Sequence, residues 1–167
     1  MKKIVSMFMV IVMALTLSMT AFAAEKEASE ASALRDKLSD SGDCISVERI
    51  DDLIETRGVA PEVSSVEIID FGFIKEDAYP QRAGHFAVIV KMMGYGYKYA
   101  YFDGKSLGLP LETEGILNAN NVAVGWYLLY DCGELTPGQH KFEIKVQSYQ
   151  TATHQKTAFL EFSYDPK

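Results

Sequence analysis

The sequence predicts a mostly β protein that folds as an antiparallel sandwich or barrel. From about residue 63 onward, apolar and polar residues alternate with period two in one segment after another. Turn-forming residues separate these segments, and no pattern of strands alternating with helices lies between them. About seven short strands in about 100 residues are typical of such architectures.

The first 23 residues have the composition of a secretory signal peptide. Lys2 and Lys3 supply positive charge, residues 4–17 are almost entirely apolar, and an Ala-x-Ala sequence ends at Ala23. The apolar run is shorter than the roughly 20 residues needed to span a bilayer. We therefore expect cleavage near Ala23 and a mature protein that is secreted, extracellular or held in the cell envelope. An uncleaved membrane anchor is the alternative.

Cleavage would leave 144 of the 167 residues and make the protein more acidic. Two lysines leave with the signal peptide, so 14 basic residues face 23 acidic ones and the net charge changes from −7 to −9. Nucleic acids and anionic membranes favour basic partners. We expect an unknown extracellular protein or carbohydrate as partner, no nucleic acid, and no membrane insertion after cleavage.

Residues 24–43 are rich in Glu, Ala, Ser and Asp and contain only two leucines. Such a segment buries too little apolar surface to offset its ordering entropy. It predicts a flexible acidic tether that is transiently helical around residues 31–38.

Residues 44–62 predict a short helix and a connection. Ser46 is a suitable N-cap, and Gly58 and Pro61 lie where helix-terminating residues are common. The apolar residues that share one helical face are Val47, Ile50, Leu53 and Ile54.

The β domain is expected over residues 63–167. The predicted strands are residues 66–74, 85–93, 97–102, 105–111, 122–131, 142–147 and 160–164. Asp103-Gly104 lies between the third and fourth of them and is a strong hairpin signal.

The segment from Leu135 to Val146 resembles the corner before the penultimate strand of immunoglobulin-like and fibronectin type III-like domains. In that corner an L-x-P-G-x-Y turn enters a strand of alternating residues. Pro137 presets φ, and Gly138 suits the positive φ of a type II turn. His140 occupies the tyrosine position, and a neutral imidazole still has an N–H donor. The resemblance implies an antiparallel immunoglobulin-like β-sandwich and says nothing about activity.

The two cysteines, Cys44 and Cys132, are candidates for a disulfide. In an oxidising compartment this bond would close a loop of about 90 residues and contribute roughly 4 kcal/mol in the chain-entropy model. The alternative is two unpaired thiols. Neither cysteine lies in a CxxC motif or near a histidine, so no metal site is expected there.

No motif predicts an enzyme. Residues 104–108 match the G-x-S-x-G pattern of a serine nucleophile, but a hairpin turn precedes Ser106 and Pro110 follows where a helix should run. Gly94-Tyr95-Gly96 lacks the third glycine of a dinucleotide loop and predicts a sharp bend. The sequence predicts no cofactor. It also predicts no metal site, because the three histidines, His85, His140 and His154, do not have the spacing of metal ligands.

One feature favours a binding function: Tyr95, Tyr97, Tyr99 and Tyr101 recur at every second residue. In a strand these side chains share a face, where exposed rings would form a platform for sugars or a partner protein. Alternatively, they fill the inner face of the sandwich. The opposite face, with Gly96, Lys98, Ala100 and Phe102, does not decide between the two interpretations.

We therefore expect a secreted, non-catalytic binding or interaction module for an unknown extracellular carbohydrate or protein. A small secreted enzyme inhibitor, or an enzyme that acts on extracellular polymers, is the alternative. An inhibitor would present an exposed loop, for which residues 75–84 or 109–121 are long enough.

Overall fold

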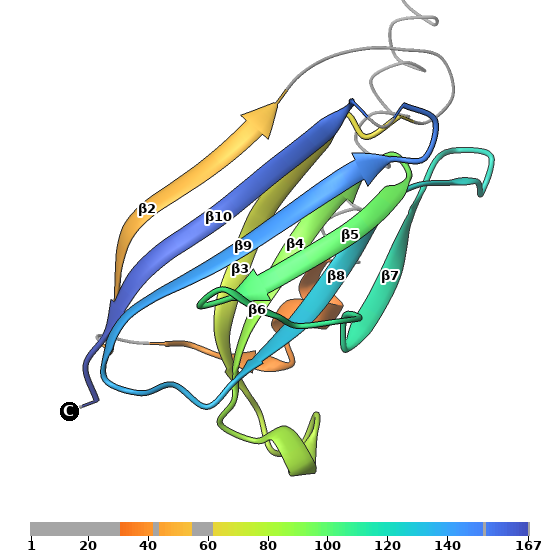
Figure 1. Cartoon of the computed structure of the whole chain (residues 1–167). Helices are drawn as coiled ribbons and strands as arrows, with labels where there is room; N and C mark the ends of the chain where they lie inside the picture. The colour runs from red at the N-terminus through yellow and green to blue at the C-terminus, as the bar shows by residue number, and fades with distance from the viewer. Residues whose placement is uncertain (1–30, 42–43, 55–61, 152, 167) are drawn as a thin grey trace, which may run out of the picture.

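The computed structural model describes residues 31–41, 44–54, 62–151 and 153–166. Its strands form two antiparallel layers, one in front of the other in Figure 1. This arrangement confirms the predicted mostly β, sandwich-like fold. The expected signal peptide lies outside the described residues. No helix in the described part of the chain is long and apolar enough to cross a membrane.

The front sheet has the strand order β6-β5-β9-β10-β2, and the back sheet has the order β2-β3-β4-β8-β7 with β1 beside β3. β2 belongs to both sheets, because it pairs with β10 along most of its length and with β3 at its last two residues. The strands are β1 (Leu38–Ser39), β2 (Ile45–Ile54), β3 (Ser65–Ile74), β4 (Phe86–Met93), β5 (Gly96–Phe102), β6 (Lys105–Ser106), β7 (Glu112–Leu117), β8 (Ala123–Gly133), β9 (Gly138–Ser148) and β10 (Gln155–Tyr164).

The helix predicted after Ser46 is wrong, because residues 45–54 form strand β2. A β-bulge explains the misleading pattern. Val47 pairs with Phe162, but Arg49 pairs with Glu161, so Glu48 is an extra residue in β2. Because of the bulge, Val47 and Ile50 are three residues apart although their partners Phe162 and Leu160 are two apart, and a spacing of three resembles a helix.

The short helix instead occupies residues 31–35, inside the segment predicted to be a flexible tether. Residues 24–30 of that segment lie outside the described part. Leu34 is fully buried, and Ala31 and Leu38 are nearly so. They cover the outer face of the back sheet and form a second core, whose members on the sheet are Ile74, Ala87, Ile89, Ile116, Tyr127 and Leu129. The tether prediction is therefore wrong for residues 31–38.

Six of the predicted strands of the β domain are present with changes at their ends, and the hairpin at Asp103-Gly104 joins β5 to β6. The strand predicted over residues 105–111 is reduced to the two residues of β6. The described residues form ten strands rather than seven, because β1, β2 and β7 were not predicted. β7 lies within residues 109–121, which were expected to form a loop. Only one residue of β7, Ile116, is buried, so the sequence of this segment does not show the alternation of apolar and polar residues that predicts a strand.

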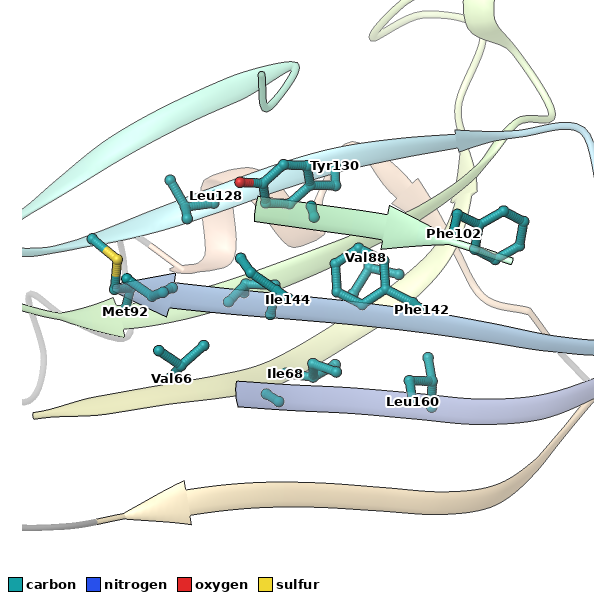
Figure 2. Packing of buried hydrophobic residues seen from close by; sticks show 14 of the residues in the cluster. Val66, Ile68, Val88, Met92, Phe102, Leu128, Tyr130, Phe142, Ile144 and Leu160 are labelled. Atoms are coloured by element: carbon teal, nitrogen blue, oxygen red, sulfur yellow. The ribbon is translucent and has the colours of Figure 1, made fainter. Parts of the chain in front are cut away.

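The main core lies between the two sheets and is lined by inward residues of both (Figure 2). Phe86, the first residue of β4, is fully buried in it, with its ring 4.7 Å from that of Phe162 and 6.2 Å from that of Phe102. β9 contributes Phe142, Ile144 and Val146, none of which is exposed to solvent. Residues two apart point to the same side of a strand, so this core fixes which residues of β5 and β9 face outward.

Gly94 allows the chain to cross from the back sheet to the front sheet between β4 and β5. Its φ is +95°, and a Cβ at this position would lie 2.1 Å from the carbonyl oxygen of Glu62. Only glycine combines that backbone conformation with so close an approach. The sharp bend predicted at Gly94-Tyr95-Gly96 is confirmed.

His140 lies near the start of β9, and both nitrogens of its ring contact oxygen atoms. Its side chain is 6% exposed, and Nε2 lies 2.7 Å from the carbonyl oxygen of Thr136. Nδ1 lies 2.7 Å from a carboxylate oxygen of Asp103, and the ring stacks on Phe102 at 5.4 Å. The imidazole therefore joins the β5–β6 turn to the start of β9.

The predicted disulfide is not formed, since Cys44 and Cys132 are both free thiols. Cys44 immediately precedes β2, whereas Cys132 lies in β8, and β3 and β4 separate these strands in the sheet order. Burial raises the pKa of the Cys132 thiol well above its ordinary value.

Leu34→Ala tests the second core. Because Leu34 is fully buried under the back sheet, the substitution should lower the free energy of unfolding by about 2–5 kcal/mol. Urea denaturation of the purified protein measures it, with the exposed Ser32→Ala as control. A Leu34→Ala variant as stable as the control would show that the helix does not seal the sheet.

His140→Phe tests the corner. It keeps an aromatic ring between Phe102 and Phe162 but removes the contacts of the imidazole with Asp103 Oδ2 and with the Thr136 carbonyl. We expect a loss of about 1–3 kcal/mol in the free energy of unfolding. The exposed neighbour Gln139→Ala should change it little. Equal stability of both variants would show that the two hydrogen bonds do not hold the corner.

Candidate functional site

β5 presents its odd-numbered residues to solvent and its even-numbered residues to the core. Ala100 and Phe102 are buried, whereas Tyr97 is 57% exposed and Tyr99 is 45% exposed. The strand leaves no other choice, since successive side chains point to opposite faces. The side chains of Tyr97 and Tyr99 are therefore exposed to solvent and do not fill the inner face of the sandwich.

Tyr95 does not belong to this exposed row. Its hydroxyl donates a hydrogen bond to the carbonyl oxygen of Ala123, and its ring lies edge-on to Trp126 at 5.8 Å. Tyr95 precedes β5 and connects the two sheets. Its role is structural.

Tyr149 joins the row, although sequence reasoning did not select it. It directly follows β9, is 54% exposed, and its ring lies 4.7 Å from that of Tyr97 at an interplanar angle of 81°. The backbone N–H of Tyr149 donates to the carbonyl oxygen of Tyr95, which fixes this end of the two strands. The sequence held one signal for it. Phe142, Ile144 and Val146 are buried and even-numbered, so the odd-numbered Tyr149 would point to the outer face if the alternation of β9 continued.

Toward the other end of β5, charged residues lie among the aromatic rings. Glu143 pairs across the sheet with Tyr101, and Lys145 pairs with Tyr99. The Lys145 ammonium lies 2.7 Å from Glu143 and 5.7 Å from the centre of the Tyr101 ring. The hydrogen bond from Lys145 to Glu143, together with the Glu143 charge, raises the pKa of Lys145, so this ammonium keeps its proton at neutral pH.

A second ion pair continues this pattern onto β10. Lys141 Nζ lies 2.9 Å from Glu161 and 4.6 Å from the centre of the Phe159 ring. We call this surface the tyrosine face; it consists of Tyr97, Tyr99, Tyr101, Lys141, Glu143, Lys145, Tyr149, Phe159 and Glu161. It lies on the outer side of the front sheet, the layer nearest the viewer in Figure 1.

Two hollows lie at the end of the tyrosine face near the β5–β6 turn. One has a volume of about 250 Å³ and is lined by Tyr101, Gly104, Lys141, Glu143 and Lys145. The other has a volume of about 300 Å³ and is lined by Glu48, Asp103, Gln139, His140, Lys141 and Glu161. Lys141 lines both hollows, so they are adjacent. Together they extend the aromatic surface into a region rich in hydrogen-bonding groups.

A polar cluster around Asp131 holds a loop in place. The Asp131 carboxylate accepts a hydrogen bond from the backbone N–H of Gly133 at 2.8 Å, and it contacts Arg82 and His85. Burial alone would raise the pKa of Asp131, but these three partners outweigh it and lower the pKa below its ordinary value. The cluster attaches the β3–β4 loop, which contains a 3-10 turn at Pro80–Arg82, to β8.

Two further clusters act in the same way. Lys37 and the hydroxyl of Tyr79 both donate to Glu112, which connects the N-terminal segment to β7. Burial and the Glu112 hydrogen bond raise the pKa of Tyr79 to about 12. In the other cluster, His154 of the β9–β10 connection contacts Glu62, which precedes β3, and its Nδ1 lies 2.7 Å from the carboxylate.

The G-x-S-x-G match does not form a nucleophile elbow. Ser106 is an exposed residue of β6, as predicted, and the chain continues from Gly108 through residues 109–111 into β7 rather than into a helix. In the described ranges, no three His, Cys, Asp or Glu side chains converge as metal ligands. His85, His140 and His154 each contact a different carboxylate.

Comparison with known proteins adds no relative. No protein-family model matches the chain. Neither the curated proteins nor the solved structures contain a match to it.

Proposed function

We propose that this protein is a secreted, non-catalytic binding module that holds an extracellular ligand on its tyrosine face. The observation that carries this proposal is the exposure of Tyr97, Tyr99 and Tyr149, between 45% and 57% each, on one side of a rigid sheet. Tyrosine supplies a large, flat contact surface with a polar tip and loses little conformational entropy on binding.

The unequal outer faces of the two sheets support the same proposal. Residues 31–38 cover the outer face of the back sheet with Leu34 and Leu38. The front sheet instead carries aromatic rings on its outer side that remain half in solvent. Large exposed aromatic residues gathered on one face are characteristic of binding surfaces.

The N-terminal sequence supports the proposed export, and the corner at His140 supports the proposed architecture. The signal-peptide composition of residues 1–23 favours export. The hydrogen bond between His140 and Thr136 favours an immunoglobulin-like sandwich, because the corner tyrosine of that family also bonds to the backbone a few residues upstream. Such domains serve many functions, so the binding role rests on the tyrosine face alone.

The double variant Tyr97→Ala/Tyr99→Ala tests the proposal. Purified mature protein is passed over immobilised collagen, fibronectin, peptidoglycan, xylan and glycogen, and its retention is measured. We expect retention on at least one polymer, and a loss of about tenfold or more in affinity in the variant, because exposed aromatic rings commonly dominate binding energy. The free energy of unfolding should change by less than about 1 kcal/mol, as is usual for exposed positions.

A variant with two exposed apolar residues elsewhere, Leu109→Ala/Val122→Ala, is the matched control and should bind like the wild type. Retention on none of the five polymers would contradict the proposal. Equal binding by the tyrosine variant would contradict it as well. A large loss of stability in that variant would show that the two rings are structural.

A further inference from the structure

The tyrosine face is an elongated track rather than a single pocket. It begins at the Tyr97–Tyr149 ring pair, follows β5 and β9 past Tyr99, and ends in the two hollows beside the β5–β6 turn. The seven residues from Tyr97 to Asp103 are separated by six steps, which extend over about 20 Å at the usual rise of a strand. A track of this length suits a chain of repeating units.

The charges of this track are paired with one another. Lys145 bonds to Glu143, and Lys141 bonds to Glu161, so these four side chains have no net charge. The second hollow adds the carboxylates of Glu48 and Asp103. The whole chain is also acidic, with a net charge of −7. An anionic polymer would be repelled rather than attracted by this surface.

Paired lysines and glutamates offer donors and acceptors side by side. A sugar hydroxyl both donates and accepts, so it can bond to an ammonium and a carboxylate at once. The flat, apolar C–H side of a pyranose ring can pack on a tyrosine ring, which has a polar tip of its own. In contrast, Lys and Glu are depleted from protein–protein interfaces, whereas here they lie beside Tyr101 and Tyr99.

We propose that the ligand is a neutral polysaccharide whose chain lies along β5, on the tyrosine rings at one end and in the Glu143–Lys145 hollow at the other. This inference rests on the proposed function and specifies its ligand class. It assigns two separate tasks. The rings of Tyr97, Tyr99 and Tyr149 stack on sugars, and Glu143 and Lys145 bond to sugar hydroxyls.

Affinity electrophoresis of the mature protein tests the inference. Native gels contain one probe each: the neutral polysaccharides xylan, glycogen, galactomannan or mixed-linkage β-glucan, or the anionic polygalacturonate. Binding to collagen and fibronectin is measured in parallel on coated surfaces. Retardation in at least one neutral gel is expected, with none in polygalacturonate and no binding to either protein.

Glu143→Gln/Lys145→Met is the decisive variant, because it removes both hydrogen-bonding charges and leaves the net charge unchanged. Its mobility in a gel without polysaccharide should therefore equal that of the wild type. Its affinity for the neutral polysaccharide should fall by about tenfold, because Met removes the Lys145 donor and the neutral amide of Gln accepts a weaker hydrogen bond than a carboxylate does. The exposed and distant Glu76→Gln serves as control and should bind normally.

The outcomes separate this inference from the proposed function. Tyrosine-dependent binding to collagen or fibronectin, without retardation by any neutral polysaccharide, would overturn the inference and leave the binding module intact. A preference for polygalacturonate would overturn it too. Normal affinity of Glu143→Gln/Lys145→Met would exclude the hollow from the site. Binding to no probe would contradict both the inference and the proposed function.

Discussion

The burial of Ala100 and Phe102 between the two sheets is the constraint on which the rest of this structure depends. These residues belong to a core that includes Phe86, Phe142 and Phe162, and they fix the orientation of β5. A shift by one residue would turn the three tyrosines of β5, Tyr97, Tyr99 and Tyr101, inward and the core residues outward. The outward orientation of Tyr97, Tyr99 and Tyr101 is therefore a consequence of core packing, whereas Tyr149 lies in the connection that follows β9.

The outer faces of the two sheets differ in composition. Ala87, Ile89 and Leu129 make the back sheet apolar on its outer side as well, and the segment around Leu34 covers them. Ion pairs such as Arg35–Asp70, at 2.9 Å, hold that segment in place. The front sheet mixes aromatic rings with Lys–Glu pairs, a composition that is compatible with water and with a hydroxyl-rich ligand. This difference is why we assign binding to the front sheet.

Sequence reasoning succeeded where one residue type repeated at a constant period. The strands with regular alternation, such as β9 and β10, were predicted within a few residues, and so was the turn at Asp103-Gly104. It failed for β2, because the bulge at Glu48 broke the alternation. It also failed for residues 31–38, whose few apolar side chains are ordered only by a sheet that lies far away in sequence.

The exposure of the tyrosines was left open, because period two reveals which residues share a face but not which face is inside. Tyr149 was missed for a related reason, since only the pairing of β5 with β9 brings it beside Tyr97.

The central claim is that Tyr97, Tyr99 and Tyr149 face solvent while the rings of Tyr127 and Tyr130, 3% and 1% exposed, are enclosed. Hydroxyl-radical footprinting of the folded mature protein, read by mass spectrometry at each tyrosine, tests it most directly. We predict rapid modification of Tyr97, Tyr99 and Tyr149 and strong protection of Tyr127 and Tyr130. Protection of Tyr97 and Tyr99 to the same degree as Tyr130 would place the row in the core and contradict the account.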